Sequence, residues 1–302
     1  MIETSQLQTL LSVSRAMSFS KAAEDMHVTQ SAISQSIKNL ENKLGVKLFK
    51  RAGKNIVLTP EGEKLSLFAR DFLQKLNDTL DDIHYHKDSM AGNIRIGTLT
   101  GVGKSWLGSE MLVFAKDYPE LKLSITLASQ EELVAQFEKY NLDFIVVPED
   151  TLPHNGEKKF LGEESCTLVY PKGSQFQWSP DITLEEFASF PTVFFEGGDG
   201  LYSRWCLQHF GRIPRNTNIR LSVNSHGNMM RAVQMGLGVA VIPKHVLYSS
   251  FYKDKLSFLG PEYDVSNGKF YLVYHKEALE LLRIRKTLEW IESMDNPFES
   301  RS

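Results

Sequence analysis

Hydrogen-bonding side chains gather on one face of a predicted helix at TQSAISQSIKNLEN, residues 29–42. Its large apolar residues, Ile33, Ile37 and Leu40, recur four and three positions apart, which makes one stripe on an α-helix. Amides and hydroxyls are the groups that bind base edges and phosphates of DNA, whereas a solvated face usually carries Glu/Lys pairs. The opposite face holds such groups and one cation: Gln30, Ser31, Ser34, Gln35 and Lys38.

The charge of the chain is distributed unevenly. Residues 1–58 contain eight Lys or Arg and four acidic residues, a net charge of +4, whereas the whole chain carries -3 and the remainder therefore -7. A basic head on an acidic body favours contact between the head and a polyanion. Chance variation in surface charge is the alternative explanation of a difference this small.

Composition narrows the class of protein. The 302 residues are 42% hydrophobic and 24% charged, as in an ordinary globular protein with two or three domains. No apolar run is long enough to span a membrane, and the first residues, MIETSQLQTLLSV, lack the pattern of a signal peptide. Only Cys166 and Cys206 are present, which excludes a disulfide framework and favours the cytoplasm.

Three short helices and a hairpin are expected in residues 1–58. The apolar spacing predicts helices at 5–16, 21–26 and 29–44, the last capped by Thr29 and ended by Gly45. Two β-like pieces at 47–49 and 56–58 then flank a basic turn at 51–55, which predicts a small hairpin or wing.

A long helix is predicted next, from Thr59 as N-cap and Pro60 in the first turn to about His86. Its apolar residues recur with a heptad-like spacing, so a second copy of the helix is expected to cover them. Packing against its own chain is the alternative. The proposed dimerisation seam is Leu65, Ala69, Phe72, Leu73, Leu76, Leu80 and Ile83.

Strand-like and helix-like segments alternate from Gly92 onward, beginning with NIRIGTL and ending with a helix at 278–294. This alternation predicts parallel sheets with right-handed crossovers. About 210 residues is large for one sheet, so two α/β lobes are expected.

The first 90 residues resemble the winged helix-turn-helix of the LysR-type transcriptional regulators. The resemblance rests on the pair Ala22–Ala23 and on VTQSAISQSIKNLE, LGVKLFKR and LTPEG; downstream NIRIG, LDFIVVP and AVQMGLGVAVIP also fit. It implies an all-α winged helix-turn-helix at 1–58, a linker helix at 59–89 and a two-lobed, periplasmic-binding-protein-like (type 2) α/β effector domain at 90–302. Lobe I would comprise about 90–162 and 268–302, and lobe II about 163–267.

This resemblance implies contacts with double-stranded DNA. Gln30, Ser34 and Gln35 are the expected base readers, and Ser31, Lys38, Arg51 and Lys54 are expected to bind the backbone. The family often has a basic residue at the position of Gln35, which this chain lacks. The complete set of expected DNA-binding residues is Ser20, Lys21, Thr29, Gln30, Ser31, Ser34, Gln35, Lys38, Arg51 and Lys54.

A small-molecule effector is expected in the cleft between the lobes, at the carboxyl ends of strands and near helix N-termini, which favour an anion. Glu196, Arg204 and His226 lie close in sequence to the expected contacts. Those contacts are Thr98, Thr100, Gly101, Ser129, Gln130, Phe195, Tyr202, Asn224 and Ser225.

The function predicted is therefore a cytoplasmic, effector-controlled transcriptional regulator that binds an operator with paired half-sites as a homodimer or homotetramer, with RNA polymerase as a further partner. No cofactor, metal or membrane contact is expected. A thiol switch at Cys166 and Cys206 is one alternative. A two-lobed binding protein or an enzyme is another, although no nucleophile–base or metal constellation is found.

Overall fold

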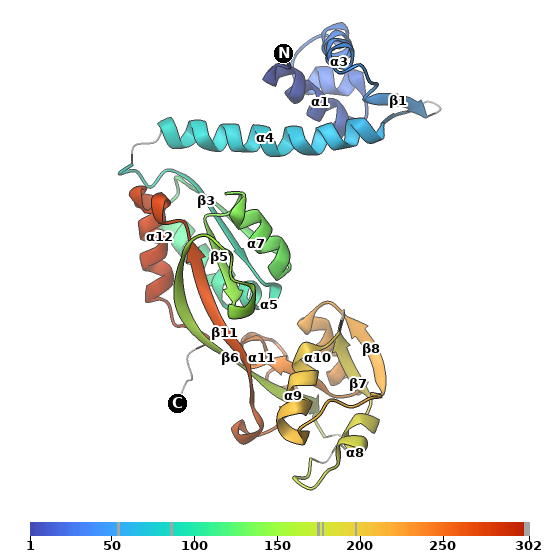
Figure 1. The fold of residues 1–302 in the computed structure, drawn as a ribbon, viewed down its shortest axis with the longest axis vertical. Coiled ribbons are helices and arrows are strands. Elements are labelled where there is room, and N and C mark those ends of the chain that lie inside the picture. The colour runs from blue at the N-terminus through green and yellow to red at the C-terminus, as the bar shows by residue number, and fades with distance from the viewer. Residues whose placement is uncertain (53–54, 85–86, 174–175, 177, 197, 299–302) are drawn as a thin grey trace. The chain divides into compact units, whose positions relative to one another are not determined.

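The computed structural model describes residues 1–52, 55–84, 87–173, 176, 178–196 and 198–298 (Figure 1). The chain divides into two compact units, Met1–His86 and Lys87–Ser302, called here the N-terminal and C-terminal units. The winged helix-turn-helix and the two-lobed α/β fold expected from the sequence are both present.

The N-terminal unit contains four helices and a hairpin among its described residues. Ser18 and Thr29 cap α2 and α3 by accepting from the backbone N–H groups of Lys21 and Ala32, and Gly45 ends α3 in the left-handed conformation. The elements are α1 (Thr4–Ala16), α2 (Phe19–Asp25), α3 (Gln30–Leu44), the antiparallel strands β1 (Phe49–Ala52) and β2 (Asn55–Leu58), and α4 (Pro60–His84).

The apolar stripe of α3 forms part of the core, as predicted. Ile33, Ile37 and Leu40 are at most 3% exposed and pack with residues of α1 and α4. Leu44, which the same spacing assigns to the core, is 36% exposed. It is the last residue of the helix, and the turn at Gly45 carries the chain away there.

Helix α4 uses part of its predicted seam within its own unit. Ala69 and Leu73 are buried, and Leu65 packs against the same cluster. These three residues therefore cover the head of their own chain and are not free to meet a second copy. The apolar side chains that α4 exposes are Leu67, Phe68, Phe72 and Leu80; Leu76 is half-buried, and the side chain of Ile83 lies outside the described residues.

The C-terminal unit is built on a mixed seven-stranded sheet of order β10-β6-β11-β5-β3-β4, with β9 also paired to β6. The predicted parallel pairing is found for β3 with β4 and β5, and for β7 with β8. It is wrong for β6, which pairs antiparallel with β9, β10 and β11. The strands are β3 (Gly92–Thr98), β4 (Leu121–Leu127), β5 (Phe144–Pro148), β6 (Glu157–Pro171), β7 (Thr192–Phe195), β8 (Ile219–Val223), β9 (Ala240–Pro243), β10 (Leu256–Phe258) and β11 (Val265–Tyr274).

Helices cover these sheets, and two of them differ from expectation. The helical stretch expected after the first strand begins at Thr100 and contains a π-helical turn, and the helix predicted at 278–294 begins as a 3-10 segment. The helices are α5 (Thr100–Val102), π segment η1 (Gly103–Leu107), α6 (Gly108–Asp117), α7 (Gln130–Glu138), α8 (Leu184–Ser189), α9 (Gly200–Phe210), α10 (His226–Gln234), α11 (Lys244–Ser249) and α12 (Leu282–Ser293), with 3-10 segments η2 (Glu149–Thr151), η3 (Pro261–Tyr263) and η4 (Lys276–Glu280).

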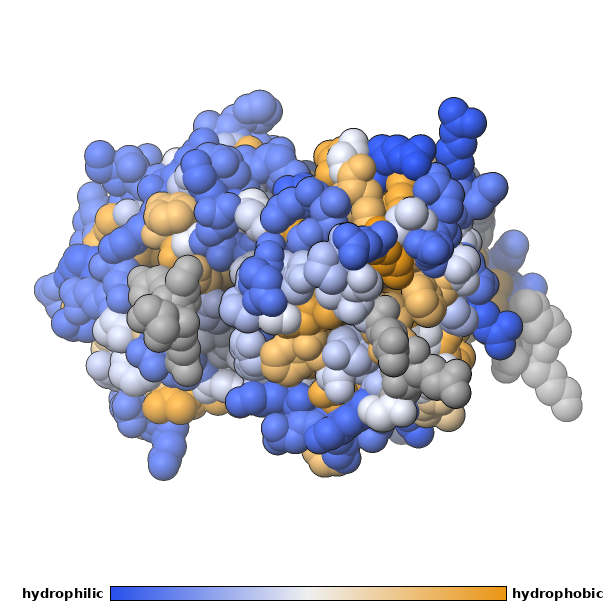
Figure 2. Space-filling view, turned by 90° about the horizontal axis from the view of Figure 1, so that it is seen from below, coloured by the Kyte–Doolittle hydropathy of each residue, from blue (hydrophilic) through white to orange (hydrophobic). Residues whose placement is uncertain are grey.

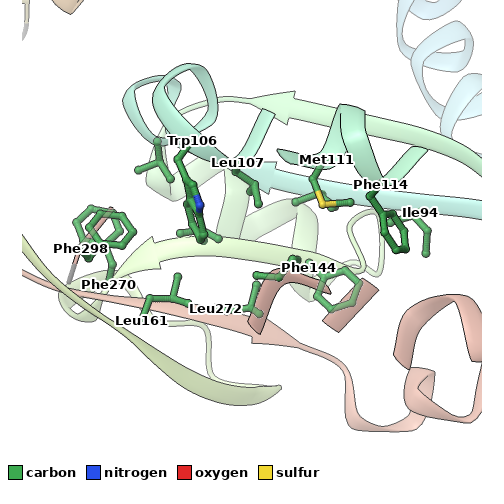
Figure 3. Packing of buried hydrophobic residues seen from close by; sticks show 14 of the residues in the cluster. Ile94, Trp106, Leu107, Met111, Phe114, Phe144, Leu161, Phe270, Leu272 and Phe298 are labelled. Atoms are coloured by element: carbon green, nitrogen blue, oxygen red, sulfur yellow. The ribbon is translucent and has the colours of Figure 1, made fainter. Parts of the chain in front are cut away.

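The described residues form two hydrophobic clusters in each of two lobes. The lobes are joined by β6 and β11, which lie side by side and extend from one lobe into the other (Figure 1). In lobe I, Trp106, Leu107, Met111 and Phe114 of the helical stretch 100–117 face the sheet strands (Figure 3). Lobe II has an aromatic core of its own around Trp205. The surface in Figure 2 is mainly hydrophilic, with hydrophobic side chains in separate patches.

Candidate functional site

The polar face of α3 is accessible to solvent. Gln30, Ser31, Gln35 and Lys38 are exposed, and Ser34 is half-buried. Side chains on this face bond to one another: the Gln30 amide donates to the Ser34 hydroxyl at 3.4 Å, and the hydroxyls of Ser31 and Thr29 lie 3.0 Å apart. The face therefore carries donors and acceptors that a duplex can recruit without any buried bond being broken.

Cations around α3 fall into two groups. Among the described residues, Lys21, Lys38 and Arg51 are exposed and have no ion-pair partner, whereas Lys43 and Lys47 pair with Glu3 and Glu41 at 3.1 and 2.6 Å. Unpaired cations are the ones free to neutralise phosphates. Ser20 is also exposed, and Lys54 lies outside the described residues.

A buried carboxylate fixes the start of the wing against α3. Glu41 accepts hydrogen bonds from the backbone N–H of Leu48 at 2.9 Å and from Lys47 Nζ at 2.6 Å. Burial raises the pKa of Glu41, but these hydrogen bonds outweigh burial and hold that pKa below its ordinary value. The charged side chain thus links α3 to the wing that carries Arg51.

The C-terminal unit has a cavity of about 640 Å³ between its lobes, within the usual size range of small-molecule sites. Of the expected effector contacts, Thr100, Gly101, Ser129, Gln130, Phe195, Asn224 and Ser225 line it. Other polar residues lining it are Asp150, Glu164, Asp199, Arg204, His226 and Asn267.

Thr98 and Tyr202 do not lie in the cavity. Thr98 is fully buried beneath the π segment, where a Cβ on Gly103 would be 2.9 Å from its methyl group. Tyr202 is 1% exposed and stacks on Phe187 in the core of lobe II. Both were expected among the contacts because of their place in sequence, but the register of a strand or helix decides which side a residue faces.

Two helices present uncapped N-termini to the cavity from opposite lobes. Helix α5 begins after Leu99, which has no capping group, and the Ser225 hydroxyl makes no capping bond at α10. Helices α7 and α9, in contrast, are capped by Ser129 and Asp199. The first N–H groups of α5 and α10 therefore lack a side-chain acceptor and suit an anion.

The charged groups of the cavity differ in whether they have partners. Glu164 and Asp199 each accept hydrogen bonds, the latter from the backbone of Tyr202 and Phe195 at 2.9 and 3.1 Å. Arg204 is exposed and has no hydrogen-bond or ion-pair partner among the residues that the structure describes. Asp150 is exposed at the cavity wall.

His226 begins α10 and its ring lies 5.0 Å from that of Phe195. Burial lowers the pKa of His226 to about 4, so the imidazole is neutral at pH 7. It therefore offers hydrogen bonding to a ligand but no charge.

Glu164 and Asn267 were missed by the sequence analysis as cavity residues. Both lie where β6 and β11 pass between the lobes, and neither belongs to a motif. The family resemblance alone could have pointed to them, because it implies that the chain passes from one lobe to the other near these positions.

The two cysteines are buried in lobe II, at most 2% exposed. Burial raises the pKa of both thiols, that of Cys206 to about 12. Thiolate is the reactive form of cysteine, so neither environment suits a redox sensor.

The described part of the chain has neither a metal-binding cluster nor a helix fit to span a membrane. No group of three or more His, Cys, Asp or Glu side chains there could hold a metal ion. No helix there combines the length and apolar character that a membrane span needs.

A winged helix-turn-helix joined to a two-lobed domain with a ligand-sized cavity defines a DNA-binding regulator with a binding domain for small molecules. The family model described as bacterial regulatory helix-turn-helix protein, lysR family, matches residues 4–63, and the LysR substrate binding domain matches residues 87–295. The chain belongs to the LysR family of transcriptional regulators. The resemblance noted in the sequence is thus confirmed, and with it a function in regulation rather than catalysis.

Relatives match along nearly the whole chain. The HTH-type transcriptional activator CmpR of Synechocystis is 26% identical over 96% of this chain and 95% of its own. The RuBisCO operon transcriptional regulator of Allochromatium vinosum is 25% identical, with 90% and 89% covered. The crystal structure of full-length CbnR complexed with its target DNA has a TM-score of 0.70 at 19% identity, covering 96% of this chain and 98% of that one, a likeness of fold.

Proposed function

We propose that this transcriptional regulator responds to a small anionic effector held in the interlobe cavity. The observation that carries this proposal is the pair of uncapped helix N-termini, α5 in lobe I and α10 in lobe II, with the unpaired Arg204 beside them. A helix N-terminus stabilises a nearby anion by about 0.3–1 kcal/mol, and more when partly buried.

The acidic residues of the cavity do not oppose an anion equally. Asp199 is engaged by backbone N–H groups, and Glu164 by His245 and Asn267. Ser225 and Asn224 add polar side chains from lobe II, and Thr100 adds a hydroxyl from lobe I. A carboxylate can therefore bind between the two helix N-termini and contact both lobes at once.

A thermal-shift screen with small carboxylates such as benzoate and citrate, followed by calorimetric titration, tests this proposal. For any acid that binds, Arg204→Gln should lower the affinity roughly tenfold or more, because a charge-assisted hydrogen bond is lost. Arg212→Gln is the matched control, since Arg212 pairs with Glu185 and does not line the cavity. Equal affinity in both variants, or no saturable shift with any acid, would contradict an anionic effector.

We further propose that α3 reads DNA through Gln30, Ser34 and Gln35. Their position opposite the buried stripe, with Gln30 and Gln35 exposed and Ser34 half-buried, supports this assignment. Backbone contacts are assigned to the surrounding groups, namely Ser20, Lys21, Thr29, Ser31, Lys38, Arg51 and, by sequence alone, Lys54. The proposed division of the chain remains 1–58, 59–89 and 90–302, and the place of action is the cytoplasm.

Self-association is proposed to use two separate surfaces. The exposed apolar face of α4 contains Leu67, Phe68, Phe72 and Leu80, and α6 exposes Leu112 and Val113. Two different self-complementary surfaces on one chain produce a tetramer, whereas one produces a dimer. A homotetramer would bring two pairs of recognition helices to paired half-sites of an operator, from which RNA polymerase is within reach.

A further inference from the structure

A series of partly buried hydrogen bonds joins the two lobes beside the cavity. The Ser105 hydroxyl lies 2.7 Å from His245 Nδ1, and His245 Nε2 lies 2.7 Å from Glu164 Oε1. Asn267 donates to the second oxygen of Glu164 at 2.5 Å. The side chains of His245 and Glu164 are only 4% and 6% exposed, so solvent contributes little to their hydrogen bonding.

The four residues come from parts of the fold that must move relative to one another if the lobes move. Ser105 lies in η1 of lobe I, and His245 lies in α11 of lobe II. Glu164 and Asn267 lie in β6 and β11, the strands common to both lobes. Asn267 is the extra residue at a break in register between these strands, next to Gly268 with φ 101°. Such bulges locally disrupt a ladder and bend it.

The π segment is what brings Ser105 to this place. Gly108 donates its backbone N–H to Gly103, five residues earlier. A Cβ on Gly103 would be 2.3 Å from a Leu127 methyl group, and one on Gly108 would be 2.5 Å from the Gly103 carbonyl oxygen. The segment therefore packs too closely for larger residues at these positions, and π turns of this kind are frequent at functional sites.

The links in this series differ in strength. A buried carboxylate is costly to leave without donors, so Glu164 holds His245 and Asn267 firmly. The bond between Ser105 and His245 joins a hydroxyl to an imidazole, and water can replace either partner when the lobes part. The weakest link is thus the one that crosses between the lobes.

The same elements also line the cavity. Glu164 and Asn267 form part of its wall, and so do Thr100 and Gly101, which begin the helical stretch that carries Ser105. A Cβ on Gly101 would lie 3.3 Å from Val246 of α11, so the two lobes already touch there. A ligand that changes the spacing of α5 and α10 must change the distance between Ser105 and His245.

The order of the side chains argues against a hydrolytic triad. In serine hydrolases Nε2 of the imidazole faces the serine and Nδ1 faces the acid, and here the two nitrogens are exchanged. Ser105 also does not line the cavity, so its hydroxyl does not meet a bound molecule.

We propose that the hydrogen bond between Ser105 and His245 is an interlobe latch, which favours the lobe arrangement of this structure and which the effector shifts. The inference rests on the proposed function in one respect: an effector bound in the cavity is what shifts the latch. The latch itself belongs to the ligand-free protein and can be tested without any ligand.

Pulsed electron paramagnetic resonance measures the distribution of distances between two spin labels, one on each lobe, and so reports the lobe arrangement. Glu120→Cys in lobe I and Asn216→Cys in lobe II replace exposed residues, and the buried native cysteines leave the introduced thiols as the sites of labelling. Labelled chains are diluted with unlabelled chains so that only the distance within one chain is recorded. Ser105→Ala should change the ratio of lobe arrangements roughly three- to tenfold, the effect of losing one hydrogen bond.

Two controls separate the latch from a general loss of packing. Ser105→Thr keeps the hydroxyl and should restore the wild-type distance distribution, and Ser249→Ala, which removes an intrahelical bond in α11, should leave it unchanged. His245→Gln should change the distance distribution as much as Ser105→Ala does, and the double variant should change it no further. A wild-type distribution in Ser105→Ala, or an equal change in Ser249→Ala, overturns the latch. These distributions are recorded without ligand, so failure of the anionic-effector proposal, which ligand titration tests, would be seen separately.

Discussion

The side-chain amide of Gln35 donates a hydrogen bond to Asn39 Oδ1 at 2.8 Å, one turn further along the exposed face of α3. The bond holds the amide of Gln35 in a fixed orientation before DNA arrives. An amide that is already oriented loses less rotamer freedom on contact, which favours specific recognition. Asn39, which the sequence analysis left out, is therefore a positioning residue for Gln35.

Gln35→Ala should relax the preference for one base pair of the operator by about 1–3 kcal/mol, because a bidentate amide contact with adenine is lost. Binding to a panel of operators that differ at single positions measures this. Asn39→Ala should weaken the same preference by a smaller amount at the same position. A base preference that Gln35→Ala leaves unchanged would remove Gln35 from the readout.

Lys38→Ala should weaken binding to every sequence alike, since an unpaired lysine contacts phosphate and carries no sequence information. The slope of log affinity against log salt should fall by about 0.9 when one phosphate contact is lost. Lys43→Ala is the matched control, because Lys43 is occupied by Glu3. An effect confined to one base pair would contradict a backbone role for Lys38.

Substitutions on the two sides of α4 should separate assembly from stability. Phe68 is 60% exposed and stacks on Phe72, so Phe68→Glu should lower the oligomeric state in analytical ultracentrifugation with little loss of folding stability. Leu73→Ala should leave assembly intact and destabilise the N-terminal unit by about 2–5 kcal/mol, because Leu73 packs in its core. Far-UV circular dichroism reports that loss. If Leu73→Ala disrupted assembly and Phe68→Glu did not, the second copy would contact the side of α4 that carries Leu73.

The features that the sequence predicts correctly are those determined within a single helix or turn. The capping of α3 by Thr29, its end at Gly45 and its buried stripe all follow from spacing within 17 residues, 29–45. The start of α4 after Thr59 is equally local, since the Thr59 hydroxyl accepts from the Gly62 N–H. Local signals of this kind do not depend on the rest of the fold.

The cavity could be predicted only in part, because its residues come from elements far apart in sequence. Helix N-termini after strands were recognisable, and Thr100, Ser129 and Ser225 do line it. Tyr202 faces the core because the tertiary packing of α9 fixes which side of that helix is buried. Glu164 is brought to the cavity by β6 and its irregular pairing with β11, which no pattern in β6 itself reveals.

Mild hydrogen peroxide should leave Cys166 and Cys206 unmodified in the native protein, because burial disfavours both thiolates. Peptide mass spectrometry after treatment, together with DNA affinity before and after, measures this. The same thiols should react once the protein is unfolded in urea. A crosslink between Cys166 and Cys206 formed in the native state would restore the redox alternative.

Acid should destabilise the C-terminal unit through His226. The folded protein holds the pKa of this imidazole at about 4 by burial, against 6.5 for the unperturbed group. Between these values the unfolded chain binds more protons, so stability is complete above pH 6.5 and falls as pH drops toward 4. The loss over this window should be roughly 3 kcal/mol at most.

Urea denaturation at pH 7 and pH 4.5, followed by tryptophan fluorescence, isolates this effect, since all four tryptophans lie in the C-terminal unit. His226→Gln should reduce the difference in unfolding free energy between the two pH values. His209→Gln is the matched control, because the pKa of His209 is also lowered by burial but outside the cavity. Each variant should remove only the part of the pH dependence of unfolding free energy that its own imidazole contributes. An unchanged pH difference in His226→Gln would show that the folded protein leaves the pKa of this imidazole at its ordinary value, and the cavity would then present a cation at this position only in acid.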